Sequence, residues 1–421
     1  MSFDGFCVIA GSNVLLVQKF GGTSVGSIER IKGVAQRVAA SVKDGNNIVV
    51  VVSAMSGETN KLLELCGHFT EDNRDREVDA IVSTGEEVSS ALLALALKDI
   101  GVSAKSYRAH QVKILTDDKH GQARIKSVET QKLLDAIQND QVAVVTGFQG
   151  VDSENNVTTL GRGGSDTTAV ALAAGLSADA CEIYTDVQGV FTTDPNVVPS
   201  ARKIDRISYE EMLDLSSLGA KVLQLRSVEF GMKYNVPIHV RSSFESAPGT
   251  WVVKADKKME SVKVSGVTMA KNEARVTVSG LPEQNDTMSK IFGSLTDEGI
   301  VVDMILKTES SGGLIDVTFT VPRQDMERSR LRLAKEFGGT SSFKISSNDK
   351  IAKVSVVGLG MRSHYGVANT MFSILSKEGI KVDFVTTSEI NISVVIDEKY
   401  GELALRSLHD GFGLHENPDF E

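Results

Sequence analysis

The chain has 421 residues and a mass of 45.2 kDa, which is enough for two or three domains of ordinary size. Charged residues make up 24% and hydrophobic residues 41%, so the composition excludes a wholly disordered or a fibrous protein. The formal net charge of −10 argues against a surface that neutralises nucleic-acid phosphates or anionic lipid. We therefore expect neither nucleic acid nor a membrane as a partner.

The first residues and the cysteines indicate where the protein works. Residues 1–13 contain no basic stretch followed by a long apolar one, and no later run approaches the roughly 20 apolar residues of a membrane helix. Cys7, Cys66 and Cys181 are too widely spaced for a metal-binding or redox pair. These features predict a cytoplasmic protein, and no function is assigned to residues 1–13.

The first half of the chain has the pattern of an α/β fold with a largely parallel sheet. Short β-branched runs alternate with longer segments at helical spacing from Val14 to about Arg241. A helix after the first run is expected to begin at Ser27 as N-cap and to bury one face. The residues expected on that face are Ile28, Ile31, Val34, Ala35 and Val38. The runs expected to be buried strands are 14–19, 47–53, 142–147 and 237–240.

A lysine-rich polar stretch, KADKKMESVKV, follows Trp251 and is typical of a linker, so we place a domain boundary near 255–263. Beyond it the sequence repeats itself. IFGSLTDEGIVVD at 291–303 resembles MFSILSKEGIKVD at 371–383. Each copy has the pattern strand, helix, strand, strand, helix. Two small modules are therefore predicted after the larger domain.

Two glycine-rich loops are suited to binding phosphate. In KFGGTSVGS (19–27) a strand ends in Lys19, two glycines follow and a helix begins; in LGRGGSDTTAVALAAGL (160–176) a loop with Arg162 and Asp166 runs into a helix. Glycines let backbone amides approach an anion, and a helix N-terminus adds positive potential. Taken singly, a plain turn with a solvent lysine explains the first loop equally well, and a local ion pair or helix cap explains Arg162 and Asp166 better than catalysis does.

Further segments make the pattern specific. SAMSGETN (53–60), STGEE (83–87), YTDVQGVFTTDP (184–195) and GAKVLQLRSVE (219–229) occur in order with the two loops. With them the chain resembles the aspartokinases, monofunctional members of the amino acid kinase family that carry a regulatory pair of ACT modules. The resemblance implies an α/β protein, with an amino acid kinase-like αβα sandwich followed by two ferredoxin-like βαββαβ ACT modules. The implied domains are 14–253, 264–348 and 349–416.

The resemblance implies that ATP phosphorylates the β-carboxylate of L-aspartate to give 4-phospho-L-aspartate, the first step of aspartate-family amino acid biosynthesis. The β-carboxylate is already ionised at neutral pH, so the reaction needs no general base. Its barrier is the approach of one anion to another, which positioning and charge neutralisation by Lys19 and Mg²⁺ would lower. ATP and Mg²⁺ are the implied cofactors.

By the same resemblance, Lys19 holds the transferring phosphate and Asp166 orients that lysine, so both are predicted to be catalytic. Glu86 is preferred to Glu87 as a substrate ligand because the family pattern places the functional acid directly after Gly85. The aspartate-binding residues are expected to be Ser53, Thr59, Glu86 and Arg162. The ATP-binding residues are expected to be Lys19, Gly21, Gly22, Thr185, Asp186, Asp194 and Lys221.

No metal site made by protein ligands is predicted, because the seven histidines show no ligand spacing such as H-x-x-x-H. Mg²⁺ is expected to arrive with ATP, held mainly by phosphate oxygens and water.

The first small module departs from the ACT pattern where effectors bind. It has LPEQNDTMSK (281–290) in place of a Gly-containing turn, and Lys307 and Thr308 in place of Gln-Asn. A cation at Lys307 would repel an effector ammonium, so weakened feedback by lysine or threonine is predicted. Alternatively, Lys307 points to solvent and the effector binds another face. ACT modules usually pair through their edges, so a homodimer or larger homo-oligomer is expected.

Two other functions are compatible with parts of the sequence. A kinase for glutamate or another small amino acid would keep the phosphate loops and change the groups around Thr59, Glu86 and Arg162. A non-catalytic amino-acid sensor would use only the ACT modules. A substrate panel in an ADP-coupled assay separates the first from an aspartate kinase, and steady aspartate-dependent ADP release excludes the second.

Overall fold

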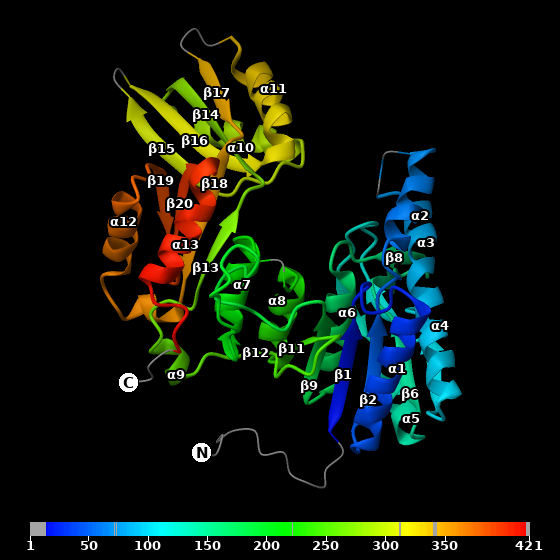
Figure 1. Cartoon of the computed structure of the whole chain (residues 1–421). Coiled ribbons are helices and arrows are strands. Elements are labelled where there is room, and N and C mark those ends of the chain that lie inside the picture. Colours follow the sequence, from blue (N-terminus) through cyan, green and yellow to red (C-terminus); the bar gives the residue numbers. More distant parts are fainter. Residues whose placement is uncertain are drawn as a thin grey trace. The chain divides into compact units, whose positions relative to one another are not determined.

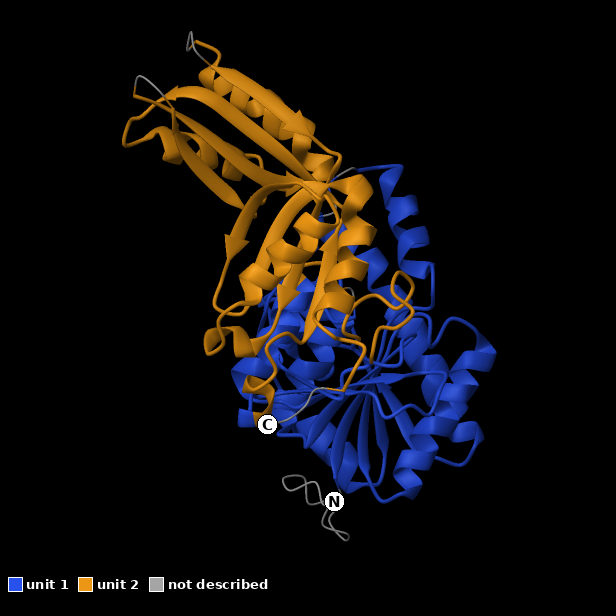
Figure 2. Cartoon of the chain, turned by 60° about the vertical axis from the view of Figure 1, so that its left-hand side comes forward, with its two compact units in different colours: residues 1–190, 203–216, 221–257 blue, residues 191–202, 217–220, 258–421 orange. Residues whose placement is uncertain are grey.

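The computed structural model describes residues 14–70, 72, 74–220, 222–310, 313–339 and 343–417 (Figure 1). The chain divides into two compact units (Figure 2). The first comprises 1–190, 203–216 and 221–257, and the second comprises 191–202, 217–220 and 258–421. The second unit thus takes in two short segments, 191–202 and 217–220, that the sequence places within the larger domain.

The first unit is built on an eight-stranded sheet in the order β10-β12-β11-β9-β1-β2-β6-β3. The four predicted strands are present as β1, β2, β6 and β11. Neighbouring strands from β11 to β3 run parallel, whereas β12 runs antiparallel to β11. Bounds are β1 (Leu15–Phe20), β2 (Asn47–Val52), β3 (Ala104–Tyr107), β6 (Val142–Thr146), β9 (Ala180–Thr185), β10 (Arg206–Ser208), β11 (Ile238–Ser242) and β12 (Thr250–Val253).

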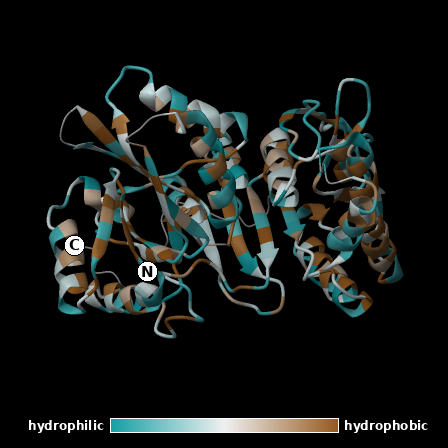
Figure 3. Ribbon diagram, turned by 90° about the horizontal axis from the view of Figure 1, so that it is seen from above, coloured by the Kyte–Doolittle hydropathy of each residue, from teal (hydrophilic) through white to brown (hydrophobic). Residues whose placement is uncertain are grey.

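Helices cover both faces of this sheet, which gives the expected αβα sandwich. α1 and α4 pack on one face, against Ile48, Val50 and Val52 of β2. α6 packs on β1, β2 and β9 and against α8. In Figure 3 the helices carry both brown, hydrophobic and teal, hydrophilic residues, as expected of helices with one face on a sheet. Bounds are α1 (Ile28–Lys43), α2 (Glu58–Gly67), α3 (Arg76–Val82), α4 (Thr84–Asp99), α5 (Gln131–Gln138), α6 (Gly164–Leu176), α7 (Tyr209–Ser217) and α8 (Leu225–Tyr234).

Helix α1 agrees with the sequence prediction except at its first residue. The Ser27 side chain caps the helix by accepting a hydrogen bond from the Arg30 amide at 3.3 Å. Ile31, Val34 and the other predicted apolar residues of the stripe are buried. The prediction for Ile28 was wrong: it is 47% exposed, because at the very start of the helix it lies beyond the packed layer.

A small sheet in the order β5-β4-β7-β8 was not predicted. Its strands have only three or four residues, which is too short for a period-two pattern to be recognised. Helix α3 packs against β8. Bounds are β4 (Ile114–Thr116), β5 (Ile125–Val128), β7 (Gln149–Val151) and β8 (Val157–Thr159).

Among the described residues, one helical stretch, Arg76–Asp99, is long and apolar enough to cross a membrane, although the sequence analysis expected no such run. It combines α3 and α4. Half of its apolar window is buried within the structure, and Glu86 is buried in its middle. This burial is that of a core helix in a folded domain.

Beyond its two short upstream segments, the second unit runs from residue 258, within α9 (Lys257–Glu260), and contains two four-stranded sheets. The first sheet has the order β15-β16-β14-β17 and the element order βαββαβ, as expected for a ferredoxin-like module. Its apolar core includes Val276, Ile291 and Phe319. Bounds are β14 (Glu273–Pro282), α10 (Thr287–Asp297), β15 (Ile305–Ser310), β16 (Leu314–Pro322), α11 (Met326–Phe337) and β17 (Lys344–Asn348).

The second sheet has the order β13-β18-β20-β19, and its edge strand β13 comes from far upstream in the sequence. β13 (Gly266–Ala270) falls within the range predicted for the first module, 264–348, but it pairs antiparallel with β18 of the second. Sequence repetition shows how modules follow one another and carries no information on which sheet a flanking strand joins. The first module is therefore inserted between β13 and the rest of the second. Bounds are β18 (Ile351–Val357), α12 (Val367–Lys377), β19 (Val382–Thr387), β20 (Asn391–Asp397) and α13 (Gly401–Gly411).

Candidate active site

A cavity of about 320 Å³ in the first unit lies where β1 and β2 end and where α4 and α6 begin. Carboxyl ends of parallel strands are the usual place for a ligand in an open α/β sheet. All six residues predicted to be catalytic or to bind aspartate line this cavity: Lys19, Ser53, Thr59, Glu86, Arg162 and Asp166. Gly22, predicted to bind ATP, lines it as well.

Lys19 and Asp166 form a buried ion pair in this cavity. Lys19 Nζ lies 2.5 Å from Asp166 Oδ1, and each side chain is 11% exposed. Lys19 is the fifth residue of β1, and Asp166 lies in the first turn of α6, so the pair joins a strand end to a helix N-terminus. A solvent lysine and a local ion pair are both incompatible with this arrangement.

Glycines let the loops around the cavity approach one another. A Cβ at Gly22 would lie 2.9 Å from the carbonyl oxygen of Ala54, closer than a side chain tolerates. Gly163, the N-cap of α6, has φ +72°, and a Cβ there would overlap the side chain of Gln224. These close contacts explain why both loops contain glycine.

Glu86 is a buried carboxylate that is only half satisfied. It is 3% exposed, and its Oε1 accepts a hydrogen bond from the Ala54 amide at 3.0 Å. Its Oε2 has no hydrogen-bond partner among the described residues. Burial raises the pKa of Glu86 to about 7, although the bonds from the Ala54 and Glu86 amides oppose that rise. The neighbouring Glu87 instead pairs with Arg108, at 3.0 Å, and does not line the cavity.

The remaining cavity residues carry hydrogen-bonding groups on loops. Arg162 is exposed, and within the described parts of the chain no ion pair is found for it. The Ser53 amide donates to the carbonyl of Phe20 at 3.1 Å, which ties the loop after β2 to the end of β1. Thr59 lies in the first turn of α2. The cavity thus combines a half-satisfied carboxylate, a solvent-accessible guanidinium and hydroxyl groups.

Asn60, Phe148 and Ser165 also line the cavity, although no role was predicted for them from the sequence. Phe148 follows β6, and its amide donates to Thr168 Oγ1 at 3.2 Å. Because β6 is a neighbour of β2 in a parallel sheet, its position at the carboxyl edge was the available signal.

Comparisons with known proteins identify the family. The amino acid kinase family model matches residues 14–242, and an ACT domain model matches 354–412. The aspartate kinase of Pseudomonas putida is 51% identical over 401 residues, covering 95% of this chain and 98% of that protein. The aspartokinase of Helicobacter pylori (strain J99) is 47% identical over 408 residues, covering 96% and 100%. The chain belongs to the aspartokinases.

A solved aspartokinase has the same fold. The crystal structure of E. coli aspartokinase III in complex with aspartate and ADP matches with a TM-score of 0.79 and 25% identity, covering 94% of this chain and 99% of that one. The αβα sandwich and the ACT modules predicted from the sequence are thereby confirmed.

Of the residues expected to bind ATP in this aspartokinase, Lys19 and Gly22 line the cavity, whereas Gly21, Thr185, Asp186 and Asp194 do not. Thr185 ends β9, whose neighbour β1 leads into Gly21, and the Gly21 amide donates to the Tyr184 carbonyl at 3.3 Å. Thr185 Oγ1 donates to Asp186 Oδ1 at 3.1 Å. Asp194 belongs to the second unit, where it accepts hydrogen bonds from Asn196. Lys221 lies outside the described residues.

Proposed function

We propose that the cavity transfers the γ-phosphate of ATP to the β-carboxylate of L-aspartate, with ADP and 4-phospho-L-aspartate as products. The observation that carries this proposal is the unpartnered Oε2 of buried Glu86, in the same cavity as Arg162 and the Lys19–Asp166 pair. A buried carboxylate oxygen without a donor calls for a cationic partner, and an amino-acid ammonium supplies one.

In this proposal the two ends of aspartate bind different charges. Glu86 accepts a hydrogen bond from the substrate ammonium, and Arg162 donates two parallel hydrogen bonds to the α-carboxylate. Ser53 and Thr59 line the aspartate site beside these two groups. This leaves the β-carboxylate free to face the phosphate, and because it is already ionised no side chain has to remove a proton.

Phosphoryl transfer then depends on neutralising charge between two anions. Lys19 donates to the transferring phosphate, and Asp166 fixes the position of its ammonium. The amides of Gly22 and Thr23, which donate to no acceptor in the described part of the chain, are available to phosphate oxygens. We assign Gly21, Thr185, Asp186, Asp194 and Lys221 to ATP binding.

The residues that line the cavity suit a nucleotide that arrives with its own bound Mg²⁺. The cavity offers donors for phosphate, and its two carboxylates, Glu86 and Asp166, are both buried and belong to different helices, α4 and α6. The one group of three His, Cys, Asp or Glu side chains close enough to share an ion among the described residues is His409, Asp410 and His415, in the second unit. Bound Mg²⁺ would neutralise phosphate charge.

An ADP-coupled assay with hydroxylamine tests the proposal, because hydroxylamine traps an acyl phosphate as a hydroxamate. We expect ADP release and hydroxamate formation with L-aspartate, and little of either with L-glutamate. Equal rates with glutamate would show a broader amino-acid kinase. Absence of aspartate-dependent ADP release would contradict the proposal and favour an ACT-based sensor.

We further propose that lysine or threonine acts at the ACT modules, with weakened feedback. Lys307 does not stand as an isolated cation, since its Nζ lies 2.5 Å from Glu283 Oε1. The two departures from the ACT pattern, one in the turn before α10 and one in β15, thus contact each other. The Glu283 carboxylate partly cancels the repulsion between Lys307 and an effector ammonium that the sequence predicts. Effector binding is still weakened in this proposal, because the effector must displace the Lys307–Glu283 pair.

A cytosolic homodimer or larger homo-oligomer completes the proposal. β15 is an edge strand whose residues are all exposed, including Ile305 and Leu306, and an exposed apolar edge favours pairing with another copy. Light scattering of the purified protein measures the assembly directly.

A further inference from the structure

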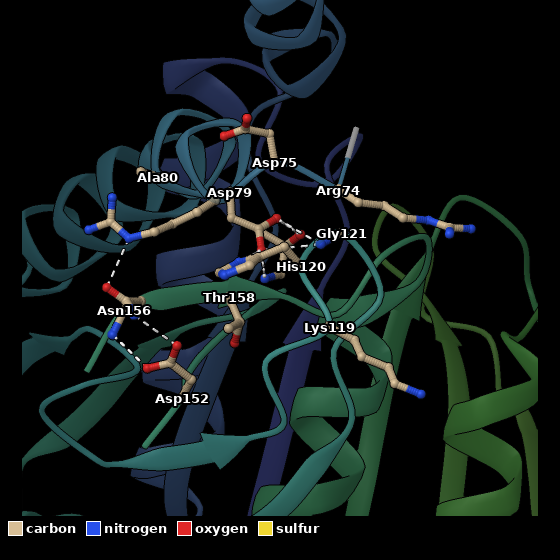
Figure 4. A network of polar contacts seen from close by, with 12 residues as sticks. Arg74, Asp75, Asp79, Ala80, Lys119, His120, Gly121, Asp152, Asn156 and Thr158 are labelled. Carbon is tan, nitrogen blue, oxygen red and sulfur yellow. Dashed lines mark hydrogen bonds and ion pairs between the residues drawn. The ribbon is translucent and has the colours of Figure 1, made fainter. Parts of the chain in front are cut away.

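Asp79 is a fully buried carboxylate that receives donors from three residues (Figure 4). His120 Nδ1 lies 2.8 Å from Oδ2, and the Gly121 amide lies 3.1 Å from each oxygen. The Thr159 amide donates to Oδ2 at 3.0 Å, and the Thr159 hydroxyl donates to Oδ1. The carboxylate is therefore held rigidly, since both of its oxygens are bonded to backbone.

These donors lie beneath the loop that carries Arg162. Thr159 is the last residue of β8, and Leu160, Gly161 and Arg162 follow it directly. The Gly161 backbone rests on Gly121, because a Cβ at Gly161 would lie 2.9 Å from the Gly121 carbonyl oxygen. Asp79 hydrogen-bonds to Gly121, which contacts this loop, and to Thr159, from which the loop starts. It therefore fixes both segments that support the loop.

The carboxylate itself belongs to the other wall of the cavity. Asp79 is in α3, which leads through Ser83 into α4, and Glu86 lies in the first turn of α4. Ser83 is held in turn, since its carbonyl accepts from Gln149 Nε2 at 3.0 Å. Asp79 therefore ties the helix pair that presents Glu86 to the loop that presents Arg162.

We propose that Asp79 is a positioning residue, which sets the separation of Glu86 and Arg162 and so the affinity for a ligand carrying both an ammonium and a carboxylate. The inference rests on the proposed function of those two residues. A ligand held at both ends is sensitive to this separation, because a misplacement of about 1 Å can cost on the order of 100-fold in rate. Neither Asp79 nor its partners line the cavity.

Asp152, the residue after β7 of the small sheet, provides a matched control near Asp79 (Figure 4). It is 6% exposed and accepts hydrogen bonds from the amides of Glu154 and Asn156 at 2.9 and 2.8 Å, and from Asn156 Nδ2 at 2.9 Å. These bonds close a local turn. Asn156 Oδ1 in turn accepts from Arg76 Nε of α3 at 2.9 Å, but Asp152 itself bonds neither to α3 nor to residues 160–162. Asp152→Asn thus removes a buried charge that has comparable bonds and no direct bond to either wall of the cavity.

The experiment compares Asp79→Asn and Asp152→Asn by steady-state kinetics. For Asp79→Asn we expect the KM for aspartate to rise at least about 10-fold while the KM for ATP stays within about twofold. For Asp152→Asn we expect both constants to stay near those of the wild type. An unchanged aspartate KM in folded Asp79→Asn, or an equal rise in both variants, would overturn the proposal.

Two further measurements keep the proposal testable on its own. Thr159→Val removes only the hydroxyl bond, and if Asp79→Asn does not fold this variant must still show the selective rise in aspartate KM, at about threefold. Hydrogen exchange of residues 160–165 needs no substrate; it should be faster in Asp79→Asn and Thr159→Val, and unchanged in Asp152→Asn. If the wild type does not phosphorylate aspartate, the proposed function fails, and exchange alone decides whether Asp79 holds the loop.

Discussion

Lys19 Nζ and Asp166 Oδ1 lie 2.5 Å apart, and both side chains are almost fully removed from solvent. Breaking a buried pair by removing one partner leaves the other charge unpaired, which typically costs about 3–5 kcal/mol. A single substitution here therefore changes stability as well as catalysis, and the two effects have to be separated by a second substitution.

Lys19→Met is expected to lower kcat by about 100- to 1,000-fold, because it removes the cation that acts on the transferring phosphate. It is also expected to lower the Tm. The double variant Lys19→Met, Asp166→Asn should recover most of that Tm, since no unpaired charge remains, and should stay inactive. Kinetics with calorimetry on both variants test this. A single variant that kept half of the wild-type kcat would remove Lys19 from the catalytic residues.

Arg162→Ala is expected to act on aspartate and not on ATP. Loss of a charge-assisted two-pronged contact costs on the order of 2–3 kcal/mol, or about 30- to 150-fold in kcat/KM for aspartate. Because Arg162 is exposed, its removal should leave the Tm near that of the wild type. Arg162→Lys keeps the charge and loses the planar fork, so it should recover only part of the activity. A lowered Tm with unchanged aspartate kinetics would show that the role of Arg162 is structural.

Aspartate binding is expected to release protons near neutral pH. The pKa of Glu86 is raised to about 7 by burial, so about half of the carboxyl groups are protonated at pH 7 in the free enzyme. The substrate ammonium favours the ionised form, so binding should release up to about half a proton, and the KM for aspartate should rise as the pH falls below 7. Calorimetric titration in buffers of different ionisation enthalpy measures this release. Glu86→Gln should show none, and a release of equal size in that variant would place the titrating group elsewhere.

Glu182 stabilises the first unit through a buried ionic network. Burial alone would raise its pKa, but bonds and charges from His239, Arg241 and Gln18 outweigh burial and lower the pKa to about 2. A lowered folded-state pKa stabilises the protein above the unfolded value near 4.5, and this contribution is lost as pH falls toward 2.

Glu182→Gln should therefore lower the free energy of unfolding by on the order of 3 kcal/mol at pH 7 and by roughly half of that at pH 3. Urea denaturation at both values measures the difference. Glu58→Gln, which breaks an exposed pair with Lys61, should change little at either pH. A Glu182→Gln effect independent of pH would exclude the charge as its source.

Feedback by lysine or threonine, added separately and together, is expected to be weak. The Lys307–Glu283 pair is partly exposed, so the double variant Lys307→Gln, Glu283→Gln should strengthen inhibition by less than about tenfold. Submillimolar half-inhibition of the wild type by either amino acid would contradict the weakened feedback.

The sequence predicts the central strands because they are uninterrupted apolar runs, and the modules because a segment at 291–303 is repeated at 371–383. It also predicts the cavity-lining residues, since Lys19, Glu86 and Arg162 each lie in a recognisable segment. Long-range pairing is not encoded in such patterns. Three contacts depend on distant segments meeting in space: that of Asp79 with Thr159, that of β13 with β18 and that of Lys307 with Glu283.

The origin of β13 limits how the protein can be divided and the order in which it can be completed. A fragment that begins at residue 349 would leave β18 as a bare edge, with the hydrogen-bonding groups paired to Gly266–Ala270 open to solvent. During synthesis, β13 emerges well before β18, so it has to wait for the whole inserted module before it finds its partner. We expect such a fragment to aggregate through this edge. Fusing a segment equivalent to 266–270 ahead of residue 349 should cover the edge and keep the fragment monomeric.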